Sequence, residues 1–250
     1  MNHSPRLAAA LALLAIAAAP STTLASDLTV GSGSALALGT SNLDLGCADL
    51  AIAGALDVAN GSIDAVRHVV VQPGGSLDGG TGVLQVAGDW TNSGTFVASM
   101  GTIAFADGCG VTTATISSDS TFSTLSLTSS TAKTYQFAEG STQTVSTHLH
   151  ISGAPGNLLA IRSKTDGVQA NIDLQGTQLV DWVDVKDNHA IGSSIGYPGN
   201  SVSSGNTTGW FAIAAVPALP LVGLLALMAT MALGARRLLG PRPPNRVSAA

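Results

Sequence analysis

The sequence has little charge and few aromatic residues. Lysine, arginine, aspartate and glutamate make up 10% of its 250 residues, and phenylalanine, tryptophan and tyrosine make up 4%. This composition excludes a charged disordered tail and is unlike that of an ordinary enzyme. Small apolar and hydroxyl residues dominate instead, together with 29 glycines. Short runs rich in threonine, valine and isoleucine favour strands, and glycine favours the turns between them, so the composition predicts repeated β pairing.

Basic residues are especially scarce in the body of the chain. All fifteen acidic residues lie from Asp27 to Asp187, where there are only five basic ones, which gives this stretch a net charge of −10 without histidine. The five are Arg67, Lys133, Arg162, Lys164 and Lys186. Phosphate binding needs clustered lysine and arginine, so this acidic body excludes nucleic acid as a partner.

The first 25 residues have the order of features found in an export signal. A polar start with Arg6 precedes an apolar run from Leu7 to Ala19, and the small residues that follow end at Ala25. We therefore predict a helical signal peptide over residues 1–25, cut by signal peptidase between Ala25 and Ser26. A buried N-terminal helix is the alternative, and the export order argues against it.

A long uncharged segment lies near the other end. Residues 216–235 are twenty apolar or small residues whose most polar member is Thr230, and this length is enough to cross a bilayer. Arg236 and Arg237 follow directly, so the positive-inside rule places the basic, proline-rich tail 238–250 in the cytoplasm and the acidic body outside. The alternative, a buried core helix, would show a polar face.

The start of this segment resembles a known type of sorting signal. Val216-Pro217-Ala218-Leu219-Pro220, an apolar helix and Arg236-Arg237 are similar to the tails of the PEP-CTERM and IPTL-CTERM groups. The resemblance implies that an exosortase-type membrane enzyme cuts near the motif and releases or re-anchors the ectodomain at the cell surface. The motif lacks the acidic residue of one group and the Ser-Glu-Trp that often follows in the other. A plain membrane anchor is therefore the alternative.

Between the two ends, one pattern repeats from Leu28 to Ile195. Short apolar or threonine-rich runs alternate with glycine, asparagine or aspartate turns, as in Val69-Val70-Val71 followed by Pro73-Gly74-Gly75. Alternation with period two predicts strands, and we expect an all-β fold. A parallel β-solenoid and a β-sandwich of hairpins both fit. Runs that are apolar at successive positions suit strands covered on both faces, which favours the solenoid.

The chain is thus divided into five segments. They are the signal peptide 1–25, a β-repeat ectodomain 26–195, a Gly/Ser/Asn-rich linker 196–215, the sorting motif with its transmembrane helix and arginines 216–237, and the tail 238–250. The ectodomain resembles repeat segments of bacterial exoproteins that carry such tails. The similar stretches are residues 44–50, 88–96, 140–145, 156–163, 183–188 and 205–210. This resemblance implies location and fold more than activity.

Cys47 and Cys109 are the only cysteines. An exported chain meets an oxidising compartment, so we expect one disulfide that closes a loop of about sixty residues. Two free or buried thiols are the alternative.

Two other groups of residues have the composition of metal ligands. His148 and His150 share one face of a predicted strand, but no third ligand lies nearby in the sequence, and exposed polar positions explain them better. A carboxylate cluster has the residue types that hold calcium, without the spacing of a calcium loop. It consists of Asp173, Asp181, Asp184, Asp187 and Asn188. We predict no metal site and no cofactor.

The sequence also predicts no enzyme. A β-helical polysaccharide lyase or hydrolase would need a base with cations or a carboxylate pair, yet the acids are scattered and Arg162 and Lys164 are the only compact cationic pair. No Gly-x-Ser-x-Gly motif occurs. We expect a structural or adhesion protein of the cell envelope or matrix, with a carbohydrate-binding module as the alternative. A binding module would gather exposed aromatics, whereas Trp90, Trp182 and Trp210 lie far apart in the sequence.

Overall fold

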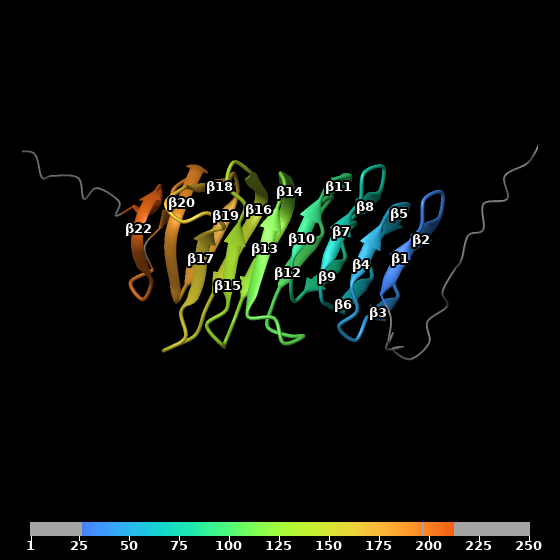
Figure 1. Cartoon of the computed structure of the whole chain (residues 1–250), viewed down its shortest axis with the longest axis horizontal. Coiled ribbons are helices and arrows are strands. Elements are labelled where there is room, and N and C mark those ends of the chain that lie inside the picture. The colour runs from blue at the N-terminus through green and yellow to red at the C-terminus, as the bar shows by residue number, and fades with distance from the viewer. Residues whose placement is uncertain (1–26, 197, 213–250) are drawn as a thin grey trace, which may run out of the picture. The chain divides into compact units, whose positions relative to one another are not determined.

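The computed structural model describes residues 27–196 and 198–212, which form a parallel β-solenoid of about nine turns, or rungs (Figure 1). The first strands of successive rungs begin at residues 28, 50, 69, 90, 113, 134, 159, 183 and 202, so a rung takes about twenty residues. Strands of neighbouring rungs pair in parallel, with the exceptions of β11 (Thr95–Val97) and β19 (Thr177–Asp181), which pair only with the rung before them. This confirms the predicted all-β solenoid rather than the sandwich, because a sandwich of hairpins would pair its strands antiparallel.

Three ladders of strands, here called A, B and C, form three faces. Ladder A contains β1 (Leu28–Val30), β4 (Leu50–Ile52), β7 (Val69–Val71), β10 (Trp90–Asn92), β13 (Thr113–Ser117), β15 (Thr134–Phe137), β17 (Leu159–Ser163) and the first parts of β20 (Val183–Gly192) and β22 (Val202–Thr208). Ladder B contains β2 (Ala35–Ala37), β5 (Ala55–Asp57), β8 (Ser76–Asp78) and β11 (Thr95–Val97), then the first parts of β14 (Ser120–Thr128) and β16 (Thr142–Ser152), then β18 (Ala170–Leu174) and the end of β20.

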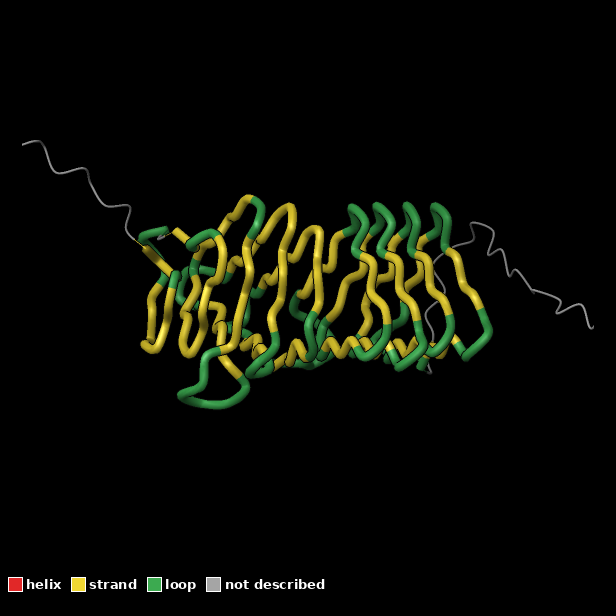
Figure 2. The backbone as a smooth tube through the Cα atoms, turned by 90° about the horizontal axis from the view of Figure 1, so that it is seen from above, coloured by secondary structure: helices red, strands yellow, loops and turns green. Residues whose placement is uncertain are grey.

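Ladder C is built from the third strand of each rung. It contains β3 (Asn42–Asp44), β6 (Ser62–Val66), β9 (Val83–Val86), β12 (Thr102–Phe105), the second parts of β14 and β16, and β19 (Thr177–Asp181). Two short strands, β21 (Ile195–Gly196) and β23 (Trp210–Ala212), pair with each other. Figure 2 shows the turns of the N-terminal rungs stacked in register.

The core runs along the inside of the solenoid. Because side chains alternate between the two sides of a strand, the same inward position of each rung stacks into a column. On ladder A one column joins Leu50, Val69, Trp90, Ile116 and Phe137, all at most 1% exposed. The alternating apolar pattern in the sequence thus records which residues point inward.

Close approach of neighbouring rungs requires glycine at some corners. A Cβ atom on Gly54 would lie 2.2 Å from the carbonyl oxygen of Gly31, and one on Gly75 would lie 2.1 Å from that of Ile52. No side chain fits at such distances, so these glycines allow one corner to rest on the backbone of the rung before it.

The solenoid extends further than the sequence predicted. Strands β22 and β23 lie inside residues 196–215, which the composition indicated to be a linker, and Trp210 is only 6% exposed. The prediction was wrong here because small polar residues also occur on the exposed side of a β rung, where composition cannot distinguish them from a linker.

Several predicted features lie outside the described residues. These are the signal peptide with Ala25 and Ser26, the sorting motif Val216, Pro217, Leu219 and Pro220, the transmembrane helix, and Arg236 and Arg237. Within residues 27–196 and 198–212, no helix has the length and apolar character needed to span a membrane.

Candidate functional site

Ladder B is interrupted between the fourth and fifth rungs. Strand β11 is the edge of a four-stranded sheet with β8, β5 and β2, and the next strand of this face, the first part of β14, belongs to the large sheet. After β11 the chain turns sharply into β12, whereas β14 continues without a turn through the same corner over nine residues. The two strands therefore do not form a ladder with each other.

A groove of about 380 Å³ lies at this interruption. Thr95 lines it from the fourth rung, Thr121 from the fifth, and Thr142 and Thr144 from the sixth. Phe96 also lines the groove. We call it the junction groove. It presents a row of hydroxyl groups beside an aromatic ring.

An aromatic cluster packs beneath the junction groove. The ring centroid of Phe96 lies 5.0 Å from that of Trp90 and 5.6 Å from that of Phe122. Trp90 is fully buried, and its Nε1 donates a 3.0 Å hydrogen bond to the hydroxyl of Ser120. Edge-on and tilted rings at these distances attract each other beyond simple area burial. The groove thus has a rigid floor.

Polar atoms at one side of the junction groove have unused hydrogen-bonding capacity. Asn92 Nδ2 donates a 3.4 Å hydrogen bond to the carbonyl oxygen of Asp119, while Asn92 Oδ1 is buried without a partner. Asp119 Oδ1 accepts a 2.8 Å bond from the backbone amide of Thr142. A buried amide oxygen without a partner costs free energy. A ligand with many hydroxyls and an apolar side would match this lining.

The residues with the composition of calcium ligands do not converge. Asp184 accepts hydrogen bonds from Arg162 Nη2 at 2.5 Å and from Ser204 Oγ at 2.6 Å. Asp181 bonds Asn200, and Asp173 bonds Gln175 on face B. Among the residues that the structure describes, no group of three histidine, cysteine or acidic side chains could hold a metal ion.

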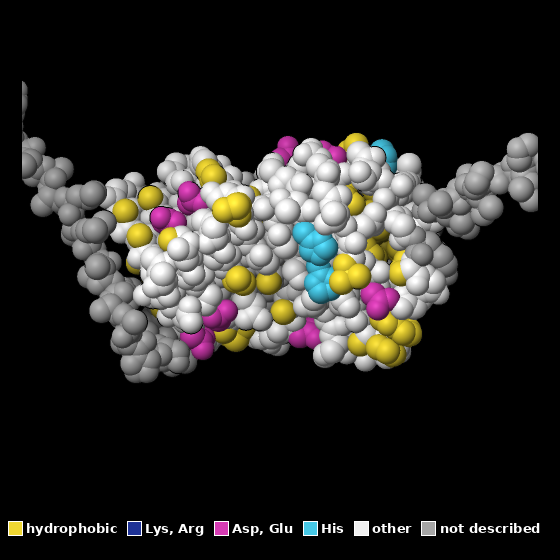
Figure 3. Space-filling view, turned by 180° about the vertical axis from the view of Figure 1, so that it is seen from behind, with side chains coloured by type: hydrophobic (Ala, Val, Ile, Leu, Met, Phe, Trp, Pro, Cys, Tyr) yellow, Lys and Arg dark blue, Asp and Glu magenta, His cyan; other side chains and the backbone are white. Residues whose placement is uncertain are grey.

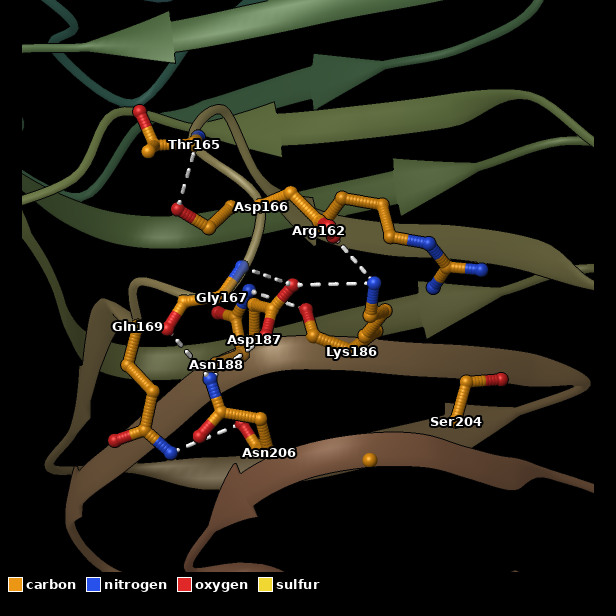
Figure 4. A network of polar contacts seen from close by, with 12 residues as sticks. Arg162, Thr165, Asp166, Gly167, Gln169, Lys186, Asp187, Asn188, Ser204 and Asn206 are labelled. Carbon is orange, nitrogen blue, oxygen red and sulfur yellow. Dashed lines mark hydrogen bonds and ion pairs between the residues drawn. The ribbon is translucent and has the colours of Figure 1, made fainter.

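Asp187, the deepest of these carboxylates, forms the centre of a corner network (Figure 4). It is 3% exposed and accepts hydrogen bonds from Asn206 Nδ2 at 2.7 Å and from the Gly167 amide at 3.1 Å. The hydrogen bond from Asn206 is the largest cause that holds the pKa of Asp187 below its ordinary value. Asn188, next in the chain, is fully buried, and its Oδ1 has no partner. These side chains fix the corners of the last rungs.

Arg162 and Lys164 do not act as a pair. Arg162 is bound to Asp184 across the rung boundary, and Lys164 lies exposed at the corner that follows β17. The compact cationic site that a lyase would need is therefore not formed by these two residues.

The two cysteines are joined although they belong to distant rungs. Cys47 lies in the first rung and Cys109 in the fourth, and the disulfide brings their Cα atoms to 5.4 Å. The turn 106–112 folds back along the corner to reach Cys47, and it encloses a cavity of about 130 Å³ lined partly by Ala65 and Ala87. Both cysteines adopt positive φ, 70° and 52°, a region that few residues other than glycine occupy.

Lys133 anchors the base of this turn, and sequence reasoning gave it no role. Its side chain is 1% exposed, and its ammonium donates to the carbonyl oxygens of Ala87 and of Ala106, the latter at 2.9 Å. Burial lowers the pKa of Lys133, against the opposing charges of Asp107 and Asp89. The sequence signal was weak, since a lone lysine between strands usually lies in solvent.

The histidines and tryptophans take separate places. His148 and His150 share face C of β16, as the alternation predicted, with ring centroids 6.5 Å apart. Trp90 and Trp210 belong to the core, and Trp182 is half-buried.

Sequence reasoning missed the junction groove with Asn92, Phe96 and Asp119. The available signal was the longer insertion before the fifth rung, which carries the second cysteine. When the chain is compared with protein-family models, curated proteins and solved structures, none of them matches.

Proposed function

We propose that this chain is exported to the cell envelope and acts there by contact, as a structural or adhesion protein. The observation that carries the proposal is the run of polar side chains outside the solenoid. On face C one outward column holds Thr102, Thr124, His148 and Thr177 in successive rungs. Such columns offer a long, uncharged, hydrogen-bonding surface, which suits contact with polymers or other surfaces better than enclosure of a small substrate.

The two ends of the sequence support this placement. The predicted signal peptide directs export, and the predicted apolar segment with Arg236 and Arg237 holds the ectodomain at the membrane. Processing near Val216 by an exosortase-type enzyme would then release or re-anchor the solenoid at the surface. The partners in this proposal are the membrane, signal peptidase and extracellular polysaccharide.

Cell fractionation with mass spectrometry of both termini tests the proposal. We expect an envelope or surface protein that begins at Ser26. A C-terminus near Val216 would indicate a sorting enzyme, and a chain that retains Arg246 would indicate a simple anchor. A cytosolic chain that still begins at Met1 would contradict export.

The junction groove favours a second, more specific function, the binding of a saccharide. Hydroxyls of Thr95 and Thr121 can bond sugar hydroxyls, while Phe96 offers an apolar surface for the ring carbons. Binding of the full chain to a glycan array measures this directly.

Variants separate the groove from the general surface. For any glycan bound saturably, Thr121→Ala and Phe96→Leu should each weaken binding about tenfold, the effect of losing roughly 1.4 kcal/mol. Thr29→Ala, at an exposed position of ladder A, should leave it unchanged. Equal binding by all three variants would remove the groove from the proposal and leave the contact surface alone.

A further inference from the structure

His148 and His150 form a pair of imidazoles on the outside of face C. Leu149 between them is fully buried, so both rings project outward from β16. Their centroids are 6.5 Å apart, and their planes differ by 33°. Figure 3 shows two neighbouring histidine side chains near the middle of one face, where no lysine or arginine side chain is visible. Cationic repulsion of a metal ion is therefore weak here.

Each ring is oriented by a hydroxyl of a different neighbouring strand. His148 Nδ1 and Thr177 Oγ1 of β19 share a 2.8 Å hydrogen bond, and His150 Nδ1 lies 3.3 Å from Ser126 Oγ of β14. No described residue bonds the Nε2 atom of either ring. When Nδ1 carries the proton and donates it to a hydroxyl, Nε2 keeps a free lone pair, which is how histidine ligands are commonly held.

A pocket beside His150 adds negative charge. The pocket, of about 410 Å³, is lined by His150, Asp107 and Ser152 among others. Asp107 Oδ1 is buried there without a hydrogen-bond partner. Burial raises the pKa of Asp107, but hydrogen bonds from Ser129, Ser130 and Thr131 lower it to a net value below the ordinary one. The carboxylate is therefore charged at neutral pH, and the buried ammonium of Lys133 offsets part of its attraction for a cation.

The charged group on the strands packed against this part of β16 is Asp181 of β19, opposite Ser152.

We propose that His148 and His150 bind one divalent transition-metal ion through their Nε2 atoms. Imidazole nitrogens favour copper, nickel and zinc, and the general affinity order places Cu²⁺ first. The described residues supply no third histidine, cysteine or acidic ligand, so the remaining positions are filled by water or by a donor from another molecule. This inference departs from the sequence-based expectation of no metal site and does not depend on the proposed function.

Titration of the full chain in detergent with Cu²⁺ tests the proposal, with binding followed by calorimetry and by electron paramagnetic resonance. His3→Ala is present in every sample, since a histidine at position 3 together with the amino terminus would bind copper on its own. The bound ion should show imidazole nitrogen ligands. His148→Gln and His150→Gln should each weaken binding at least tenfold, as expected for loss of one of two ligands.

Two further variants separate this pair from other histidines and from general damage. His189→Gln changes a histidine on β20, in ladder B, and should leave the affinity unchanged. Thr177→Val should weaken binding about tenfold by loss of the orienting hydroxyl, while far-ultraviolet circular dichroism stays the same. The proposal is overturned if His148→Gln/His150→Gln binds Cu²⁺ as tightly as the parent chain and with the same resonance spectrum.

Discussion

The first four rungs and the last five rungs form the corners of the solenoid in different ways. In residues 27–105 the strands are three to five residues long, and tight turns close the corners, as where the Gly61 amide bonds the Val58 carbonyl at 2.9 Å. In residues 113–212 strands reach nine to eleven residues and run through corners, as β14, β16 and β20 do (Figure 2). Among the described residues, every buried polar side chain lies in this second region. They are Ser120, Ser123, Ser129, Lys133, Ser141, Gln143, Ser163, Asp187, Asn188 and Ser201.

The difference shows where backbone groups at a corner find their partners. A tight turn satisfies its own amides and carbonyls, so the N-terminal corners need only small residues. A strand that bends through a corner leaves some of these groups inside, where side chains must meet them. Fully buried Gln143, for example, donates to the carbonyl oxygen of Ser118 in the rung before, at 2.8 Å. The regular rungs therefore bury only apolar side chains, whereas the irregular rungs bury polar side chains among the apolar ones.

The largest expected effect is at the boundary between the two regions. Trp90→Ala removes a fully buried indole from its contacts with Phe96 and Phe122 and should destabilise the chain by about 3–5 kcal/mol. Urea denaturation followed by circular dichroism should then show the two regions unfolding in separate transitions. Val97→Ala, at a 46% exposed position of the same rung, is the control. If Trp90→Ala loses no more stability than the control, the aromatic cluster does not couple the unfolding of the two regions.

The disulfide should matter for the first region only. The disulfide closes a loop of 62 residues, and its loss should lower the free energy of unfolding by at most about 4 kcal/mol through chain entropy. Cys47→Ser/Cys109→Ser should therefore speed amide hydrogen exchange across residues 27–105 and leave residues 159–212 unchanged. Intact masses measured with and without reductant should differ by about two daltons in the parent chain. Equal acceleration in both regions would contradict a local role.

The buried carboxylate of Asp187 should make the stability of the second region depend on pH. The pKa of Asp187 is lower in the folded state than its ordinary value of 3.8. Its carboxylate therefore stabilises the fold fully at pH values above about 3.8. That contribution is lost as the pH falls from this value through the lowered one. Asp187→Asn should thus cost about 1–3 kcal/mol at pH 7 and progressively less toward pH 2.

Urea denaturation at several pH values measures this difference. Asp166→Asn, in the same network but 86% exposed, should have little effect at any pH. If the free energies of unfolding of Asp187→Asn and the parent differ by the same amount from pH 7 to pH 2, the loss of stability comes from packing rather than from charge.

The smallest effects should come from one surface ion pair in each region. Arg67 bonds Asp49 at 2.8 Å, but its side chain is 43% exposed, so Arg67→Ala should leave the melting temperature unchanged. Arg162 is 25% exposed and also donates to the Asp184 carbonyl at 2.6 Å, so Arg162→Ala should lower stability by about 1 kcal/mol. Thermal unfolding of both variants compares them. Equal changes would mean that ion pairs do not distinguish the regions.

The sequence allowed prediction of the repeat but not of its interruptions. The polar–apolar alternation of Thr134–Phe137 reports which side chains face inward, and this is a local property. The junction groove exists because β11 and β14 belong to different sheets, and neither strand's own sequence indicates this. The buried position of Lys133 depends on a turn that folds back over other rungs. Contacts set by three-dimensional stacking leave no local pattern. The two histidines were visible in the sequence, but the hydroxyls of Thr177 and Ser126 that orient them come from other rungs.

The disulfide between the first and fourth rungs also determines how the solenoid would carry a pulling force. Tension applied between the two ends of the chain passes through the bond from Cys47 to Cys109 and bypasses the residues between them. The enclosed loop of 62 residues, which would otherwise extend by roughly 200 Å, stays slack. Under load the segment from Cys47 to Cys109 is therefore a short covalent clamp, and only the residues before Cys47 and after Cys109 can unravel and lengthen.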